Sequence, residues 1–220
     1  GAFATGLVYY HTYDDERSID YASDGRADFD FGWFQPYALA SFLDTRERLN
    51  AELDVRAQRT QTTFAAGAKA LLSSKTGLVF DVRTAGLDFA EGTTFEGVSL
   101  SQSLNSTTRT IEGGMEFYLT PLTTFAVIAS HQTDRFDQSP ERDADTFRIL
   151  PSIRMESPAI IQGSLAVGYR RFSALQPETP DYSGLIVQGS LTHTFGERTK
   201  VDLQVSRNVR YREETGGLLG

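Results

Sequence analysis

Polar and apolar residues alternate along most of this chain, and they do so most regularly at residues 48–58. The odd-numbered residues from Leu49 to Ala57 are apolar, whereas the even-numbered residues from Arg48 to Gln58 are polar. Successive side chains of a strand point to opposite faces of a sheet, so this stretch predicts a strand with one apolar and one ionic face. No long window repeats apolar residues at helical spacing. We predict about eleven strands, at 2–13, 29–43, 48–58, 64–72, 78–89, 106–119, 124–132, 146–155, 161–172, 182–195 and 200–211.

Short and long connections alternate between these predicted strands. Short turns are expected at 44–48, 73–77, 120–123, 156–159 and 196–199, and long loops at 14–28, 91–104, 134–145 and 173–181. A short tip near Gln61 is the one exception to the alternation. Consecutive hairpins would therefore place the short turns at one rim and the long loops at the other. Transmembrane barrels of outer membranes have short periplasmic turns and longer outer loops.

The fold class predicted from this pattern is all-β, an antiparallel up-and-down transmembrane β-barrel in which residues 1–220 form one domain. The predicted strands are as long as a membrane crossing requires, roughly 9–11 residues. In lipid every backbone group must be paired, so only a closed barrel suits a membrane-spanning sheet. The alternative is a soluble lipocalin-like or sandwich protein whose ionic face meets water. Single-chain bacterial barrels have even strand numbers, so we expect this chain to be part of a barrel of twelve or more strands; a miscounted strand is the other explanation.

Composition narrows the function classes. The net charge is −8 and the isoelectric point about 4.9, which argue against a nucleic-acid partner. Cysteine is absent, so disulfides and thiol catalysis are excluded. The mean hydropathy of −0.31 is compatible with a barrel, because only half of each barrel strand is apolar. The first residues lack a basic region and an apolar core, so we expect any signal peptide to have been removed already.

A family resemblance agrees with this interpretation. The stretches at 147–158, 163–172 and 191–211 carry it, and they read FRILPSIRMESP, GSLAVGYRRF and LTHTFGERTKVDLQVSRNVRY. Within the hairpin series 108–211 they resemble the putative β-barrel porin family (type 2) of Gram-negative outer membranes. The resemblance implies a bacterial outer-membrane location and, for some members, a link with exopolysaccharide export. The family has no catalytic signature, so no functional residue is carried over.

Charged residues at the polar positions of the strands are the candidate site. We expect them to line one lumen, and they are Glu52, Asp54, Arg56, Asp81, Arg83, Glu112, Glu116, Arg148, Arg154, Arg170, Asp202 and Arg210. They could form a network of ion pairs that fills a narrow barrel, or they could line a wet pore and tune its selectivity. We favour the pore, because a barrel of twelve or more strands is wider than the eight-stranded kind that side chains fill.

The barrel interpretation also predicts which way individual side chains face. Those expected to point outward, towards lipid, are Leu49, Leu53, Val55, Ile153, Leu165, Val167, Leu185, Val187, Leu203 and Val205. Those expected to point inward are Glu52, Asp54, Arg56, Arg154, Gln188, Asp202 and Gln204. Arg or Lys on the lipid face near the midplane costs about 2–4 kcal/mol, which is why the charged set is expected inside.

Other chemistry is weakly indicated. The histidines are His11, His131 and His193, and the adjacent Ser130 and His131 would point to opposite faces of a strand, so they cannot form a catalytic dyad. The carboxylates of the acidic loop 14–28 could bind Ca²⁺, but solvated loop charges are the simpler interpretation. We therefore expect no enzyme, cofactor or metal. The expected function is a passive pore or export conduit, with outer-membrane lipid and lipopolysaccharide, export-complex proteins or further copies of the chain as partners; a plugged structural or adhesive barrel is the alternative.

Overall fold

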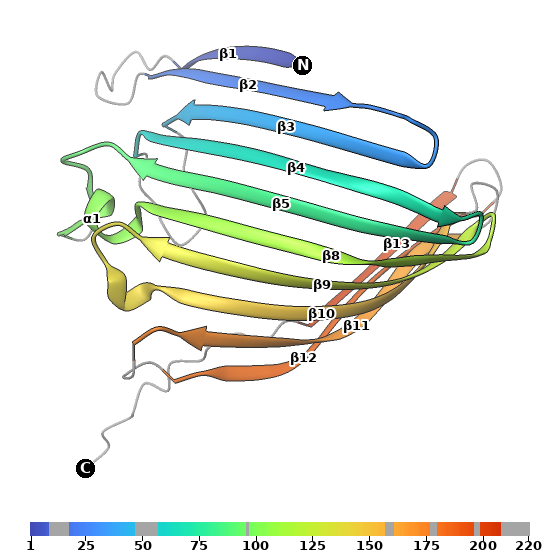
Figure 1. Cartoon of the computed structure of the whole chain (residues 1–220). Helices are drawn as coiled ribbons and strands as arrows, with labels where there is room; N and C mark the ends of the chain where they lie inside the picture. The colour runs from blue at the N-terminus through green and yellow to red at the C-terminus, as the bar shows by residue number, and fades with distance from the viewer. Residues whose placement is uncertain are drawn as a thin grey trace.

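Eleven antiparallel strands form one sheet, in the order in which they occur along the chain (Figure 1). The computed structural model describes residues 1–8, 18–46, 57–95, 97–156, 161–176, 180–195 and 199–207. The strands are β1 (Ala2–Val8), β2 (Ser18–Asp28), β3 (Phe34–Thr45), β4 (Arg59–Ser73), β5 (Thr76–Phe89), β8 (Ser106–Thr120), β9 (Thr123–Phe136), β10 (Ala144–Glu156), β11 (Ile161–Ala174), β12 (Tyr182–Phe195) and β13 (Thr199–Arg207). The predicted all-β, up-and-down order is confirmed.

Two connections in the described part of the chain contain further structure. The hairpin β6 (Thr94–Phe95) and β7 (Val98–Ser99) and the short helix α1 (Leu100–Leu104) lie between β5 and β8. The 3-10 helix η2 (Pro140–Arg142) lies between β9 and β10. No helix in the described part of the chain is long and apolar enough to cross a membrane.

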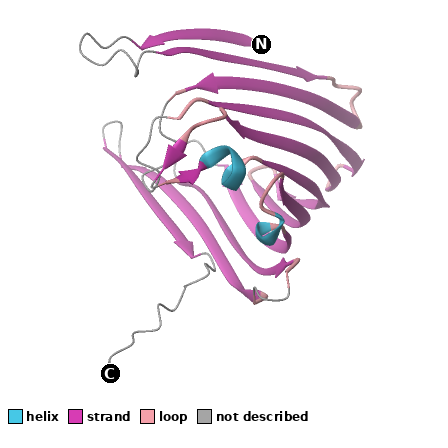
Figure 2. Cartoon of the chain, turned by 90° about the vertical axis from the view of Figure 1, so that its left-hand side faces the viewer, coloured by secondary structure: helices cyan, strands magenta, loops and turns pink. Residues whose placement is uncertain are grey.

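The sheet curves into a deep trough. Figure 2 looks along the trough from one end, and the strands follow an arc that runs from β1 round to β13. Among the described strands no pairing joins β1 to β13, so these two form the edges of an open sheet. The curvature is that of part of a barrel wall, and the predicted closure is not present among the described strands.

One predicted loop and one predicted pairing were wrong. The acidic residues at 14–28 were expected in a loop, but 18–28 form strand β2, which pairs with β1 and β3. Residues 48–58 were expected to pair with the preceding strand. Instead β3 pairs directly with β4, with Thr45 opposite Arg59. Most of the 48–58 stretch, including Leu49, Glu52, Leu53, Asp54, Val55 and Arg56, lies outside the described residues.

With the observed strand bounds, the alternation of connection lengths has no exception. The short connections span two to five residues, at 29–33, 74–75, 121–122, 157–160 and 196–198. The long ones span seven to sixteen residues, at 9–17, 46–58, 90–105, 137–143 and 175–181. The tip expected near Gln61 does not exist, because Gln61 lies within β4 opposite Leu43 and Leu87. One rim of the trough therefore carries every long connection.

Candidate functional site

The concave face of the trough is polar, and side chains on it reach across intervening strands. Lys69 of β4 contacts Glu116 of β8 across β5, and Arg148 of β10 contacts Glu112 of β8 across β9. Residues two strands apart lie about 10 Å apart in a flat sheet, so inward curvature brings such pairs together. Residues paired in the register share a face, and side chains alternate between faces along each strand, so these contacts assign every other strand position to the concave or the convex face.

The structure places eight of the twelve predicted lumen residues on this concave face. They are Asp81, Arg83, Glu112, Glu116, Arg148, Arg154, Arg170 and Asp202. The remaining four, Glu52, Asp54, Arg56 and Arg210, lie outside the described residues.

Glu116 is the centre of one cluster on this face. One carboxylate oxygen lies 2.8 Å from Nζ of Lys69 and accepts a hydrogen bond of 2.8 Å from the Tyr118 hydroxyl. The other lies 3.7 Å from Arg154, which also contacts Glu156 at 2.8 Å. The Lys69 ammonium lies over the Tyr118 ring, 5.0 Å from its centroid. The Glu116 side chain is only 12% exposed, and two cations neutralise it.

A second cluster surrounds Tyr37 of β3. The Tyr37 hydroxyl donates a hydrogen bond to Asp81 of β5, and the Arg26 guanidinium stacks 4.4 Å from the centroid of its ring. Arg26 also contacts Asp28 at 2.8 Å. Both clusters border a hollow of about 500 Å³ in the concave wall. Cations and carboxylates both line this hollow.

Glycines let the large side chains lie flat on the concave wall. A Cβ on Gly67 would sit 2.7 Å from Cε1 of Tyr37, so Tyr37 can cross β4 to Asp81 only because residue 67 is glycine. Gly77 lies beneath Tyr118 in the same way, with its added Cβ 2.9 Å from the hydroxyl. Large side chains that cover strand glycines on a neighbouring strand pin the register. The sequence did not single out Tyr37 or Tyr118. Tyr118 shares its face with Glu112 and Glu116, which was a usable signal, whereas the same-face neighbours of Tyr37 include Leu39 and gave none.

The longest connection, 90–105, folds against the concave face at the long-connection rim. Leu100 of α1 packs with Ala57 and Phe89 in a small buried cluster, which Leu87 and Phe95 border. The amide of Phe89 donates to Oδ1 of Asn105 at 2.8 Å. Leu87 and Phe89 face the same way as Gln61 and Arg59, so α1 lies within the arc of the sheet, as Figure 2 shows. This connection narrows that end of the trough.

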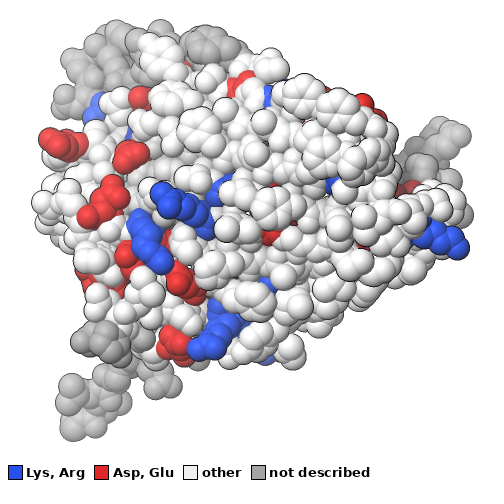
Figure 3. Space-filling view, in the orientation of Figure 1, with Lys and Arg blue, Asp and Glu red and all other residues white. Residues whose placement is uncertain are grey.

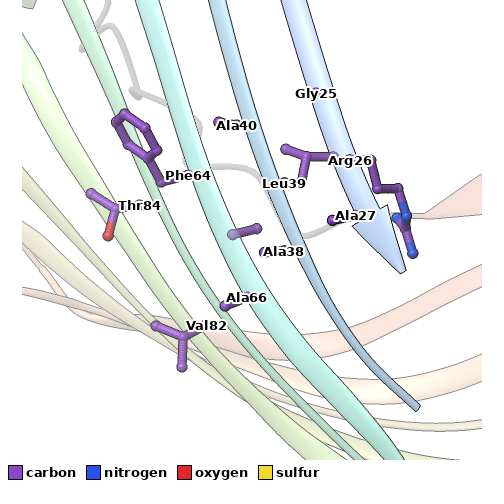
Figure 4. A pocket seen from close by; sticks show the side chains of 11 residues that line it. Gly25, Arg26, Ala27, Ala38, Leu39, Ala40, Phe64, Ala66, Val82 and Thr84 are labelled. Carbon is purple, nitrogen blue, oxygen red and sulfur yellow. The ribbon is translucent and has the colours of Figure 1, made fainter. Parts of the chain in front are cut away.

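The convex face is apolar and exposed to the surroundings. Of the residues predicted to point outward, those on the convex face of the described strands are Ile153, Leu165, Val167, Leu185, Val187, Leu203 and Val205. Their predicted inward partners Arg154, Gln188, Asp202 and Gln204 lie on the opposite face. Leu165 is 51% exposed although it is a large apolar residue. Figure 4 shows part of this face, a hollow of about 720 Å³ where β2–β5 present Ala38, Ala40, Ala66 and Val82 beside Phe64.

Charges on the convex face gather at the long-connection rim (Figure 3). The charged residues on the convex side of β2–β12 each lie within four residues of the strand end at the long-connection rim. They are Asp44, Asp88, Arg109, Arg135, Asp145 and Arg171. Between them and the short connections, the described convex positions of these strands hold no Asp, Glu, Lys or Arg. The edge strand β13 shows Val201, Leu203 and Val205 on this face, and its last described residue is Arg207.

The charge-free belt has the height of a bilayer core. On β8 it runs from Ile111 to Leu119 and on β10 from Phe147 to Met155, nine residues in each case. Nine residues at about 3.3 Å each, tilted by about 40°, give roughly 23 Å, close to the apolar band of about 25 Å in outer-membrane barrels.

The remaining candidate residues do not come together. His131 and His193 lie on the convex face, whereas Ser130 lies on the concave face and accepts a hydrogen bond from Arg148 at 3.2 Å. His11 and residues 14–17 of the acidic stretch lie outside the described residues. Within the described ranges, no three His, Asp or Glu side chains form a group that could hold a metal ion.

Comparison with known proteins gives one match. Residues 10–217 match the family described as Putative beta-barrel porin 2. No curated protein and no solved structure matches the chain.

Proposed function

This chain belongs to the Putative beta-barrel porin 2 family, and on that premise we propose that it forms a passive pore in a bacterial outer membrane. The observation that carries the proposal is the division of charge between the two faces. The concave face holds ion-paired residues such as Glu116 and Arg148, whereas the convex face has a charge-free belt as tall as a bilayer core. A charged wall facing inward and an apolar wall facing outward suit a water-filled channel surrounded by lipid.

The proposal carries a membrane location and a set of partners with it. Lipid and lipopolysaccharide would cover the convex belt, and closure of the sheet into a barrel of twelve or more strands would complete the lumen. No catalytic role is proposed. The pore and a soluble binding barrel differ in one physical respect: a soluble protein would leave Leu165, Leu185 and Leu203 exposed to water on one continuous face.

Polysaccharide export is the finer form of the proposal. Polar and aromatic side chains on the concave wall support it, since the hydroxyl groups of sugars donate to and accept from polar side chains. Tyr37 and Tyr118 lie in the polar clusters, and Phe172 stacks on Tyr182 near the long-connection rim with ring centroids 4.6 Å apart. A neutral or acidic oligosaccharide added to one side of a bilayer should then interrupt the ion current.

Conductance of the purified protein in planar bilayers tests the pore directly. The chain has no cysteine, so single cysteines can map the lumen. Ser164→Cys on the concave face should lose current when a water-soluble methanethiosulfonate reagent is added, whereas Leu165→Cys on the convex face should not. Folded protein without conductance would favour a plugged scaffold. A stable monomer in buffer without detergent would favour the soluble barrel.

A further inference from the structure

Two connections at the long-connection rim are joined to each other by hydrogen bonds. The connection 90–105 links β5 to β8 and carries α1, whereas 137–143 links β9 to β10 and carries η2. The amide of Asp137 donates to the backbone oxygen of Asn105 at 3.0 Å. Because α1 also packs on β5, the joined connections reach from β5 to β9 across the end of β8, inside the arc of the sheet (Figure 2).

Two side chains of the 137–143 connection bind the C-terminal end of α1. Ser139, which is 8% exposed, donates its hydroxyl proton to the backbone oxygen of Gln102 at 2.8 Å. Arg142 donates from Nη1 to the backbone oxygen of Ser103 at 2.6 Å. The last four carbonyl groups of a helix have no partner within that helix. Ser139 and Arg142 therefore supply two of the donors that α1 lacks, as basic side chains near a helix C-terminus can do.

Arg142 reaches α1 over the inner wall of the sheet. Its guanidinium lies over the Phe136 ring, 4.6 Å from the ring centroid. Phe136 pairs with Ser106 at a concave position of β9. The Arg142 side chain thus runs from η2 across the concave face to the backbone of α1.

The position of α1 depends on such contacts. The helix has five residues, whereas isolated helices become marginally stable only at roughly 12–15 residues. Leu100 and Ser101 are its only buried residues. Segments with few buried contacts open locally at a low free energy. Removal of one hydrogen bond to the end of α1 should therefore make this connection leave the wall much more often.

We propose that Arg142 and Ser139 form a latch that keeps the 90–105 connection inside the lumen, and that Arg142, as a positioning residue, sets the size of the solutes that pass this rim. The inference rests on the proposed pore. While the latch is closed, α1 occupies part of the opening. When the latch is broken, the connection leaves the lumen and larger solutes pass.

Thiol labelling in detergent micelles measures the latch without any conductance. The chain has no cysteine, and Ser101→Cys places a thiol of similar size at a position that is 8% exposed. A water-soluble methanethiosulfonate reagent should reach this thiol only when α1 leaves the wall. Adding Arg142→Ala should speed labelling about five- to thirtyfold, the range expected for the loss of one exposed hydrogen bond from a charged group.

Two control variants separate the latch from a general effect on the connection. Arg142→Lys keeps a cationic donor, so it should label within about threefold of the Ser101→Cys parent. Glu141→Ala changes the exposed neighbour of Arg142 on η2 and should label at the parent rate. If Arg142→Ala does not fold, Ser139→Ala, which removes the other bond to α1, repeats the test.

The size limit is measured in planar bilayers, from the loss of current when poly(ethylene glycol) of graded mass is added. Arg142→Ala should admit larger polymers than the parent, whereas Arg142→Lys and Glu141→Ala should not. Parent-rate labelling of Arg142→Ala, or faster labelling with an unchanged size limit, would overturn the proposal. A parent chain that does not conduct would contradict the pore itself, and the labelling rates would still decide whether the latch exists.

Discussion

Leu165→Arg tests the assignment of the convex face most directly. Leu165 lies opposite Ile153 and Gly189 in the register, in the middle of the charge-free belt. The nearest convex charge on its own strand is Arg171, six residues away, which is about 20 Å along the strand at 3.3 Å per residue. With a tilt of about 40°, this separation corresponds to roughly 15 Å of depth, near the centre of a band about 25 Å tall.

The expected magnitude follows from that depth. Arg on the lipid face near the midplane costs about 2–4 kcal/mol, whereas a substitution on a water-exposed surface changes the free energy of unfolding by about 0.5 kcal/mol or less. The matched control is Ser164→Arg, the same substitution at the next residue on the opposite face. It loses a hydrogen bond with the Ser190 hydroxyl, 2.9 Å away, and should cost about 1 kcal/mol.

Urea unfolding from phosphatidylcholine vesicles measures both variants. Trp33 is the one tryptophan of the chain and is exposed at a short connection, so its fluorescence reports membrane association. A loss of unfolding free energy below about 0.5 kcal/mol for Leu165→Arg, or equal losses for the two variants, would refute a lipid-facing convex belt.

Further predictions concern the concave wall. Gly114→Ala should lower the free energy of unfolding by about 1–3 kcal/mol, because the added Cβ would clash with the backbone carbonyl oxygen of Val127 and lie 2.6 Å from Ile128 Cδ1. Gly113→Ala, with its nearest contact at 3.8 Å, should change it by about 0.5 kcal/mol or less; chemical denaturation compares the two variants. Glu116→Gln leaves two cations without their shared carboxylate, so reversal potentials in a salt gradient should shift towards anion selectivity. Because the Glu116 side chain is only 12% exposed, the stability loss should be about 1–3 kcal/mol. Asn105→Ala removes the acceptor that holds the 90–105 connection to β5 and should raise single-channel conductance, while Gln102→Ala, an exposed side chain on α1, should leave it unchanged.

The alternation of polar and apolar residues was enough to predict the division of faces, because facing depends on a period of two within a strand, and the short and long connections predicted the sheet order. It failed at 18–28, where acidic residues suggested a loop. In β2, Asp20, Asp24 and Asp28 occupy concave positions, and the convex positions hold small residues such as Gly25 and Ala27, so the apolar half of the pattern was too weak to be noticed.

Contacts between strands could not be predicted from the same pattern. Arg148 and Arg170 were both expected in the lumen, but their direct opposition depends on the register of β10 against β11. A shift of two residues keeps every side chain on its face and changes every neighbour. The inward-folded 90–105 connection was likewise hidden, because its cohesion comes from Phe89 and Ala57, which lie outside it in the sequence.

The strict neighbour-to-neighbour order of the sheet has a kinetic consequence. Every pairing among the eleven strands joins consecutive segments, so each can form by closing one hairpin, and the entropy of loop closure rises slowly with the length of the connection. Folding speed falls as contacts become more distant in sequence, and closing the sheet into a barrel would bring β1 and β13, at opposite ends of the described residues, into one ring. Ring closure would then be the slow final step of assembly, and the hairpins before it could be added one at a time as the chain enters the bilayer.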